Sequence, residues 1–192
     1  MLLSLIGLLG LVITCQCMVI APYQVSVGQC PNITEKYDFD ASQYLGRWFE
    51  LEKIQYVGED DVECANAVYS DMGDGYIEVY NTGRFPTGEF TDIRGRAHEI
   101  APGVLLVEFL KNSPNELHIL DTDYENFSSV YNCVQLGELH WQYAWLLSRT
   151  MVMDEEIYSR ARLAFINNNV NVSLLETTYQ GDDCPYPVQI VL

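Results

Sequence analysis

Basic residues are scarce in this chain of 192 residues. It contains 10 Lys and Arg against 27 Asp and Glu, which gives a formal net charge of -17. Nucleic acids and anionic membrane surfaces both attract patches of Lys and Arg, and this chain has few such residues to offer. The composition therefore argues against nucleic acid as a partner. Solubility in a crowded fluid is the plain interpretation of so acidic a chain.

Charged residues of either sign are absent from the first 30 positions. The apolar run 2–13 has the length of a signal-peptide core, and small residues stand where a cut after Cys17 requires them. We therefore predict a signal peptide over residues 1–17, with a cut as late as 20–21 as the alternative. A signal peptide implies a secreted, extracellular protein.

An uncleaved membrane anchor is the competing interpretation of this segment, because residues 2–20 could nearly span a bilayer. The polar stretch 14–17 interrupts the run and favours cleavage. A bacterial lipoprotein cut before Cys15 fits less well, because Thr14 suits that recognition box poorly.

Four cysteines remain after the leader is removed: Cys30, Cys64, Cys133 and Cys184. An even number in a secreted chain predicts two disulfides, and four cysteines allow three pairings. No C-x-x-C pair and no neighbouring His accompany them, so we predict no metal site. Three sequons also agree with export, and they predict glycosylation at Asn32, Asn126 and Asn171.

The chain has no internal repeat and no low-complexity segment. Between residues 46 and 149, short apolar or alternating runs are broken by turn residues at a spacing of roughly 10–14. This pattern is typical of an all-β sandwich or barrel and not of βαβ units. We predict eight strands, at residues 46–56, 64–71, 75–82, 90–100, 104–110, 116–122, 127–135 and 139–149.

The hydrophobic period changes after residue 149 and predicts one amphipathic helix. Asp154 suits an N-cap, the next two residues are acidic as the first turn favours, and residues 167–169 end the segment. The apolar residues of the segment fall on one helical face: Ile157, Ala161, Ala164 and Phe165.

Alternation along the strands sorts their side chains into two faces. In the last strand both faces are apolar, since Ala144 and Leu146 oppose Tyr143, Trp145 and Leu147. Such a strand needs cover on both sides, and the predicted helix is the available cover. The first strand is less regular, because Trp48, Glu50 and Glu52 share one parity. Either both glutamates face inward or a bulge shifts the register.

Three motifs occur in order: Tyr-Leu-Gly-Arg-Trp-Phe-Glu-Leu-Glu-Lys-Ile at 44–54, Thr-Asp-Tyr-Glu-Asn at 122–126 and Ala-Trp-Leu-Leu-Ser-Arg at 144–149. They resemble the G-x-W, T-D-Y and closing-Arg motifs of the lipocalins. The resemblance extends from about residue 30 to 184. Residues 30–32 and 129–133 are most similar to apolipoprotein D and its invertebrate relatives of the Lazarillo and bilin-binding type.

This resemblance implies an eight-stranded antiparallel up-and-down barrel with one C-terminal helix packed outside. The barrel would occupy residues 44–192, after an N-terminal segment at 18–43. The resemblance also implies the pairings Cys30–Cys133 and Cys64–Cys184. Finally, it implies that one end of the barrel is closed by Gly46, Trp48 and Arg149, with the guanidinium stacked on the indole.

A barrel of eight strands can hold one small ligand, and the inward faces of the strands supply candidate contacts. Tyr69, Asn81 and Trp145 match positions that contact ligand in the group that the chain resembles. The predicted ligand-binding residues are Tyr69, Ile77, Val79, Asn81, Ile93, Leu105, Val107, Phe109, Tyr143, Trp145 and Leu147. For each aliphatic residue, plain core packing is the alternative.

We therefore expect a monomeric carrier of a small hydrophobic ligand such as a lipid, sterol or retinoid, with no cofactor and no catalytic residue. A bilin pigment or an odorant is the alternative ligand. Lipid particles, a cell-surface receptor and protection against oxidised lipid are further expectations from the resemblance. The acidic stretch 59–63 lies in the first loop and favours neutral guests over anionic ones.

Overall fold

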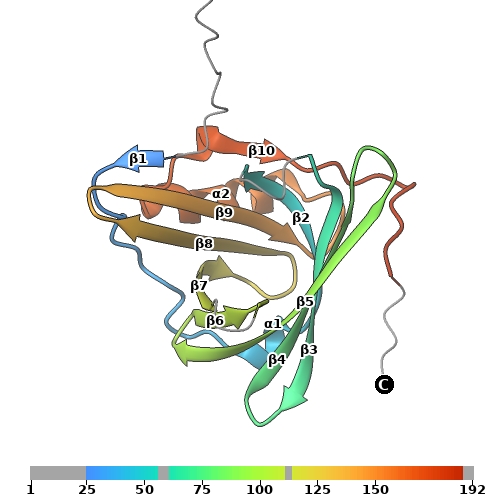
Figure 1. The fold of residues 1–192 in the computed structure, drawn as a ribbon, viewed down its shortest axis with the longest axis horizontal. Coiled ribbons are helices and arrows are strands. Elements are labelled where there is room, and N and C mark those ends of the chain that lie inside the picture. Colours follow the sequence, from blue (N-terminus) through green and yellow to red (C-terminus); the bar gives the residue numbers. More distant parts are fainter. Residues whose placement is uncertain (1–24, 56–60, 111–113, 188–192) are drawn as a thin grey trace, which may run out of the picture.

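Eight antiparallel strands close into a barrel in the computed structural model, which describes residues 25–55, 61–110 and 114–187 (Figure 1). Each strand is hydrogen-bonded to the next, and the last pairs with the first. The strands are β2 (Gly46–Ile54), β3 (Glu63–Gly73), β4 (Tyr76–Arg84), β5 (Phe90–Ala101), β6 (Val104–Glu108), β7 (Pro114–Thr122), β8 (Phe127–Leu136) and β9 (Leu139–Ser148). The predicted barrel is confirmed, and the predicted signal peptide lies outside the described residues.

Four shorter elements flank the barrel strands. They are β1 (Val25–Val27), α1 (Ala41–Tyr44), the 3-10 turn η1 (Val172–Leu174) and β10 (Leu175–Thr177). β1 pairs with β9, and β10 pairs with β2. The sequence pattern did not predict β1 or β10, because three-residue strands are too short to show an alternation.

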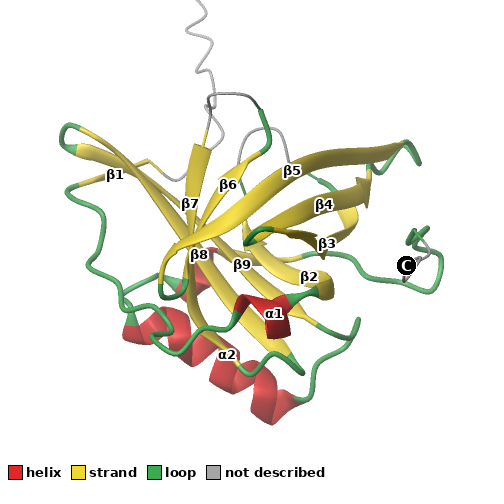
Figure 2. Ribbon diagram, turned by 90° about the horizontal axis from the view of Figure 1, so that it is seen from below, coloured by secondary structure: helices red, strands yellow, loops and turns green. Residues whose placement is uncertain are grey.

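The helix α2 (Glu155–Asn167) packs on the outer face of β7 and β8 (Figure 2). Asp154 caps it as predicted, since its carboxylate accepts a hydrogen bond from the backbone N–H of Glu156. The buried helix residues Ala161, Ala164 and Phe165 join Ala144 and Leu146 of β9 in one apolar cluster outside the barrel. The predicted cover for the outer face of the last strand is therefore present.

A second apolar cluster fills the interior of the barrel. Its largest member, Trp48, is fully buried, and Ile77, Val79, Leu105 and Val107 are buried around it. The barrel is thus a layer of strands between two cores, one inside and one under α2.

A β-bulge in β2 settles the direction of the two glutamates. The pairing of β2 with β9 shifts register between Glu50 and Glu52, so Leu51 is an extra residue on the β2 side. Glu50 consequently lies on the inner face, whereas Glu52 turns toward α2. There Arg162 and Tyr158 both donate hydrogen bonds to the Glu52 carboxylate at 2.6 Å. A buried carboxylate is tolerable at that position because both its partners are provided.

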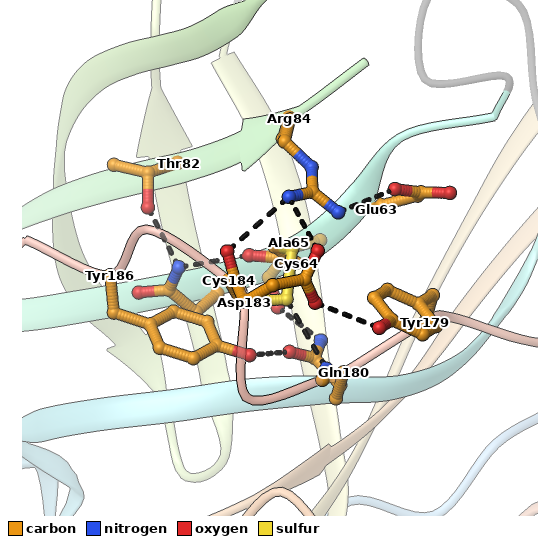
Figure 3. Close-up of a disulfide and its surroundings, with 12 residues drawn as sticks. Glu63, Cys64, Ala65, Thr82, Arg84, Tyr179, Gln180, Asp183, Cys184 and Tyr186 are labelled. Atoms are coloured by element: carbon orange, nitrogen blue, oxygen red, sulfur yellow. Dashed lines mark hydrogen bonds and ion pairs between the residues drawn. A yellow bond between two sulfur atoms is a disulfide. The ribbon is translucent and has the colours of Figure 1, made fainter. Parts of the chain in front are cut away.

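Two disulfides link segments that are far apart in the sequence, Cys30 to Cys133 and Cys64 to Cys184. These are the pairings that the resemblance implied. The first ties the N-terminal segment to β8. The second fastens the C-terminal segment beside β3 (Figure 3).

The C-terminal segment continues the wall of the barrel beyond the point where β2 and β3 separate. β2 pairs with β3 only from Gly46 to Phe49, and β10 then takes the place beside β2. The Gln180 amide donates to the carbonyl oxygens of Glu50 in β2 and Ala65 in β3, which bridges the two strands. Residues 175–180 therefore form a strip that fills the gap between these strands.

Candidate ligand-binding cavity

The barrel encloses a cavity with about 640 Å³ of empty space, including the part that opens to solvent. The cavity lies above the inner core and is lined by Glu50, Ala65, Asn66, Ala67, Tyr69, Val79, Asn81, Thr82, Phe109, Leu117, Val130, Trp145 and Leu147.

Small side chains on β3 create much of this space. Ala65 and Ala67 stand between the longer side chains of β2 and β4. Two strands away, on β9, Trp145 lines the cavity, and the Tyr143 ring stacks on it with a centroid separation of 6.3 Å and an angle of 10°. One side of the cavity is therefore a flat aromatic wall.

The polar groups of the cavity lie near β2 and β4. The Glu50 carboxylate is 6% exposed; its Oε1 accepts a hydrogen bond from the Thr178 hydroxyl at 2.7 Å and lies 3.4 Å from the Lys53 ammonium. Across β3, the Oδ1 atom of Asn81 is buried and has no hydrogen-bond partner among the described residues. A buried carbonyl oxygen without a donor costs free energy, which a ligand could recover.

Tyr69 forms part of the cavity floor, where its ring meets the fully buried ring of Tyr44 at 5.1 Å. Burial raises the pKa of Tyr69 to about 12, because the phenolate would lose its hydration. Tyr69 is therefore a neutral phenol at physiological pH and can both donate and accept a hydrogen bond.

The narrow end of the barrel is closed by Trp48 and Arg149. The guanidinium carbon lies 3.6 Å from the indole centroid, and burial lowers the pKa of Arg149. The same guanidinium donates hydrogen bonds to the carbonyl oxygens of Tyr124 and Arg47, at 2.9 and 2.8 Å. Gly46 has φ +96°, and an added Cβ would lie 3.2 Å from the Arg149 Nη1 atom. Glycine is required here for both reasons.

The family profile described as a Lipocalin-like domain matches residues 39–180. Apolipoprotein D of Mus musculus is 34% identical over 164 residues, which cover 83% of this chain and 86% of that protein. The chain belongs to the lipocalin family. The resemblance drawn from the three sequence motifs is thereby confirmed.

Other lipocalins are more distant in sequence but share the fold. The crustacyanin-C1 subunit of Homarus gammarus is 25% identical over 154 residues, which cover 79% of this chain and 84% of that protein. The crystal structure of insecticyanin from Manduca sexta superposes with a TM-score of 0.73 at 25% identity, covering 82% of this chain and 89% of that one. Lobster apocrustacyanin A1 superposes with a TM-score of 0.77 at 22% identity, covering 86% and 96%.

Six of the predicted ligand-binding residues line the cavity of this lipocalin: Tyr69, Val79, Asn81, Phe109, Trp145 and Leu147. A seventh, Tyr143, reaches the site only through its stacking on Trp145. The aliphatic residues Ile77, Leu105 and Val107 do not line the cavity. They are buried in the inner core, because they lie closer to the closed end where opposing side chains fill the barrel.

The placement of Ile93 in the lumen needs correction. Ile93 is 42% exposed and borders a second hollow, which shares Asn81 and Thr82 with the cavity. The reason is the shortness of β6, whose pairing with β5 ends at Arg96. Among the described residues, the part of β5 that carries Ile93 is therefore paired only with β4, and inward parity there does not give burial.

Seven lining residues were not predicted: Glu50, Ala65, Asn66, Ala67, Thr82, Leu117 and Val130. Ala65 and Ala67 share the parity of Tyr69, so alternation could have identified them. The inward direction of Glu50 alone could not be predicted, because the sequence does not reveal the position of the bulge. Asn66 and Thr82 lie in the wall, where the Asn66 amide donates to the Thr82 hydroxyl at 2.7 Å.

The three sequons differ in their surroundings. Asn32 and Asn171 are exposed, and Asn171 caps η1 through its Oδ1 atom. Asn126 is partly buried, and its amide Nδ2 donates to the Asp123 carboxylate at 2.9 Å. Its sequon serine, Ser128, is fully buried and hydrogen-bonded to Tyr44.

All four cysteines of the described part are joined in disulfides, so none of them is a thiolate nucleophile. Within residues 25–55, 61–110 and 114–187, no group of His, Cys, Asp and Glu side chains is placed to hold a metal ion. The same residues contain no helix that is long and apolar enough to cross a membrane.

Proposed function

We propose that this lipocalin is an extracellular carrier that holds one small hydrophobic ligand in its barrel. The observation that carries the proposal is the cavity itself, which combines a mainly apolar lining with a few buried polar groups. Apolar surface drives the binding of a hydrophobic guest, and sparse polar groups orient it. Trp145, Tyr69 and Asn81 are the contacts that we expect to matter most.

Secretion is supported by three independent features. The chain has two disulfides, and disulfides form and persist in oxidising compartments. The charge-free N-terminal segment has the pattern of a signal peptide, and the sequons at Asn32 and Asn171 lie on exposed residues. Transport of lipid, with protection against oxidised lipid by sequestration, would follow from binding in such a compartment.

The direct test is to purify the secreted protein without denaturation, extract it with organic solvent and identify the extract by mass spectrometry. A stoichiometric hydrophobic molecule in the wild type, and its depletion in Trp145→Ala, is the expected result. Leu163→Ala provides the matched control, because Leu163 is half-exposed on the outer side of α2. The absence of a hydrophobic molecule from all three extracts would count against the carrier proposal, whereas a stoichiometric molecule undiminished in Trp145→Ala would refute the role of Trp145.

A planar pigment such as a bilin is the second candidate ligand. Trp145 favours it, because its ring lines the cavity and is held parallel to that of Tyr143, so that it offers a flat face to a conjugated molecule. Visible absorbance of the purified protein that disappears on extraction would support a pigment. A colourless protein whose Trp fluorescence is quenched by a lipid would support a lipid, and not a pigment, as the ligand.

A further inference from the structure

The polar part of the cavity presents hydrogen-bond acceptors and a negative charge to its contents. We propose that the cavity selects neutral ligands with a hydroxyl or N–H donor over ligands of the same length that carry a carboxylate or lack a donor. This inference rests on the proposed carrier function and assigns Glu50 and Asn81 as the residues that determine specificity.

Glu50 gives the cavity its electrostatic sign. The bulge at Leu51 places Glu50 on the inner face, and its carboxylate lines the cavity. Lys53 is 1% exposed and is not part of the lining, although its ammonium lies 3.4 Å from the Glu50 Oε1 atom. The cation therefore stabilises Glu50 without being one of the lining residues, whereas Glu50 is one of them.

Thr178 fixes the orientation of that carboxylate. Its hydroxyl donates to the Glu50 Oε1 atom at 2.7 Å, and its backbone N–H donates to the carbonyl oxygen of Leu51 at 2.9 Å. The residue is itself buried. Two partners on one carboxylate oxygen restrict the rotation of Glu50, so its charge is held in place before a ligand enters.

Asn81 supplies the second acceptor. Its Oδ1 atom is buried without a hydrogen-bond partner among the described residues, and the residue lines the cavity. In the strand register Asn81 is opposite Ala67, whose small side chain leaves the space in front of the amide open. A ligand hydroxyl or N–H would fill that space and satisfy the oxygen. An ether or an ester would leave it unsatisfied.

A ligand carboxylate would meet two obstacles in this cavity. It would lose its hydration and come near the Glu50 carboxylate, and like charges at close range disfavour binding. It would also present acceptors to the Asn81 oxygen. Of the residues that line the cavity, Glu50 and Tyr69 alone are ionisable, and neither supplies a cation to compensate.

The test compares three probes with one chain length: dodecan-1-ol, 1-methoxydodecane and dodecanoate. Their affinities for the delipidated protein are measured at neutral pH by quenching of Trp fluorescence and by calorimetry. We expect the alcohol to bind about tenfold more tightly than the ether, which is the effect of one buried hydrogen bond. Dodecanoate should bind at least about tenfold more weakly than the alcohol.

Variants assign the two effects to residues. Asn81→Leu should abolish the preference for the alcohol over the ether. Glu50→Gln should improve dodecanoate binding about tenfold. Glu78→Gln is the control. Glu78 lies on the outer face of β4, and its replacement by glutamine removes the same charge from the protein. If Glu50→Gln does not fold, the double variant Glu50→Gln/Lys53→Met takes its place, because it removes both buried charges together.

The outcomes separate this inference from the function on which it rests. If none of the three probes binds and natively purified protein yields no ligand, the carrier function itself is wrong. If all three bind equally, the carrier stands, and selection by Glu50 and Asn81 is overturned. Tightest binding of dodecanoate would also overturn it, and would mean that Lys53 sets the electrostatic sign of the cavity.

Discussion

Replacement of Arg149 by lysine tests the physical basis of the closed end. The guanidinium stacks on Trp48 at 3.6 Å and donates to four backbone carbonyl oxygens, those of Tyr124, Arg47, Gln43 and Tyr44. These carbonyls belong to α1, β2 and the loop after β7. One planar group thus joins three segments, which a lysine ammonium cannot reproduce because it offers three donors at a single point.

The expected loss can be worked from these contacts. A lysine side chain at this position could keep about two of the four hydrogen bonds, and each lost bond is worth about 1 kcal/mol net. The partly desolvated stacking on the indole adds about 1–2 kcal/mol. We therefore expect Arg149→Lys to lower the free energy of unfolding by about 3 kcal/mol, which corresponds to a fall in Tm of roughly 6–12 °C.

A surface pair of the same geometry provides the control. Arg94 lies 3.5 Å above the ring of Tyr80 and forms one ion pair, with Glu78, on the outside of the barrel. Its side chain is 54% exposed, so Arg94→Lys should cost less than about 1 kcal/mol. Urea unfolding of both variants with the disulfides intact, followed by circular dichroism, gives the two values. Equal losses would refute the reasoning, because stacking alone would then account for both.

Three further outcomes are expected. Trp48→Ala should cost about 3–5 kcal/mol of stability. Trp145→Ala should cost less and weaken probe binding about tenfold. The reverse pattern would mean that Trp48 lines the ligand site and Trp145 closes the barrel. Because the pKa of Tyr69 rises from 10 unfolded to about 12 folded, its stabilising contribution is complete below pH 10 and is lost toward pH 12. Urea midpoints from about pH 9 to 11.5 should fall less steeply in Tyr69→Phe, and parallel curves would contradict this. Glycopeptide mapping should find glycans at Asn171 and Asn32, and full occupancy of Asn126 would show that its bond to Asp123 is dispensable.

The architecture could be predicted from the sequence because its signals are periodic. Alternation defined the strands from residue 46 onward, and the change of period after Arg149 located the helix. The two apolar faces of β9 indicated that its outer face is covered, and Ala144 and Leu146 do join the cluster under α2, although the helix itself lies over β7 and β8. The alternation along a strand shows which of its faces is buried, and that face is the same for the whole sheet, so each strand can be predicted from its own residues.

The cavity could be predicted only in part, because its shape depends on irregularities. The bulge at Leu51 sends Glu50 and Glu52 to opposite sides, and the irregular parity of the strand indicated a bulge only as one of two alternatives. Ile93 has inward parity but is exposed, because the pairing of β5 with β6 ends at Arg96 and leaves Ile93 paired with β4 alone among the described strands. Thr178 reaches the Glu50 carboxylate from a segment with no periodic pattern at all.

The acidic stretch of the first loop illustrates a second limit. Its charge predicts repulsion of anionic guests, but Glu59 and Asp60 lie outside the described residues. Glu63 forms an ion pair with Arg84 at 2.9 Å, and that arginine also binds Asp183 (Figure 3). A count of charges along the chain does not show which of them are neutralised by distant partners.

The strip formed by residues 175–180 has a consequence for the order of folding. The strands β2 to β9 can all pair once residue 148 has been synthesised, yet the wall between β2 and β3 then still lacks its last piece. Thr178, Gln180 and the disulfide from Cys184 to Cys64 complete the wall next to Glu50, and they belong to the last part of the wall to be synthesised.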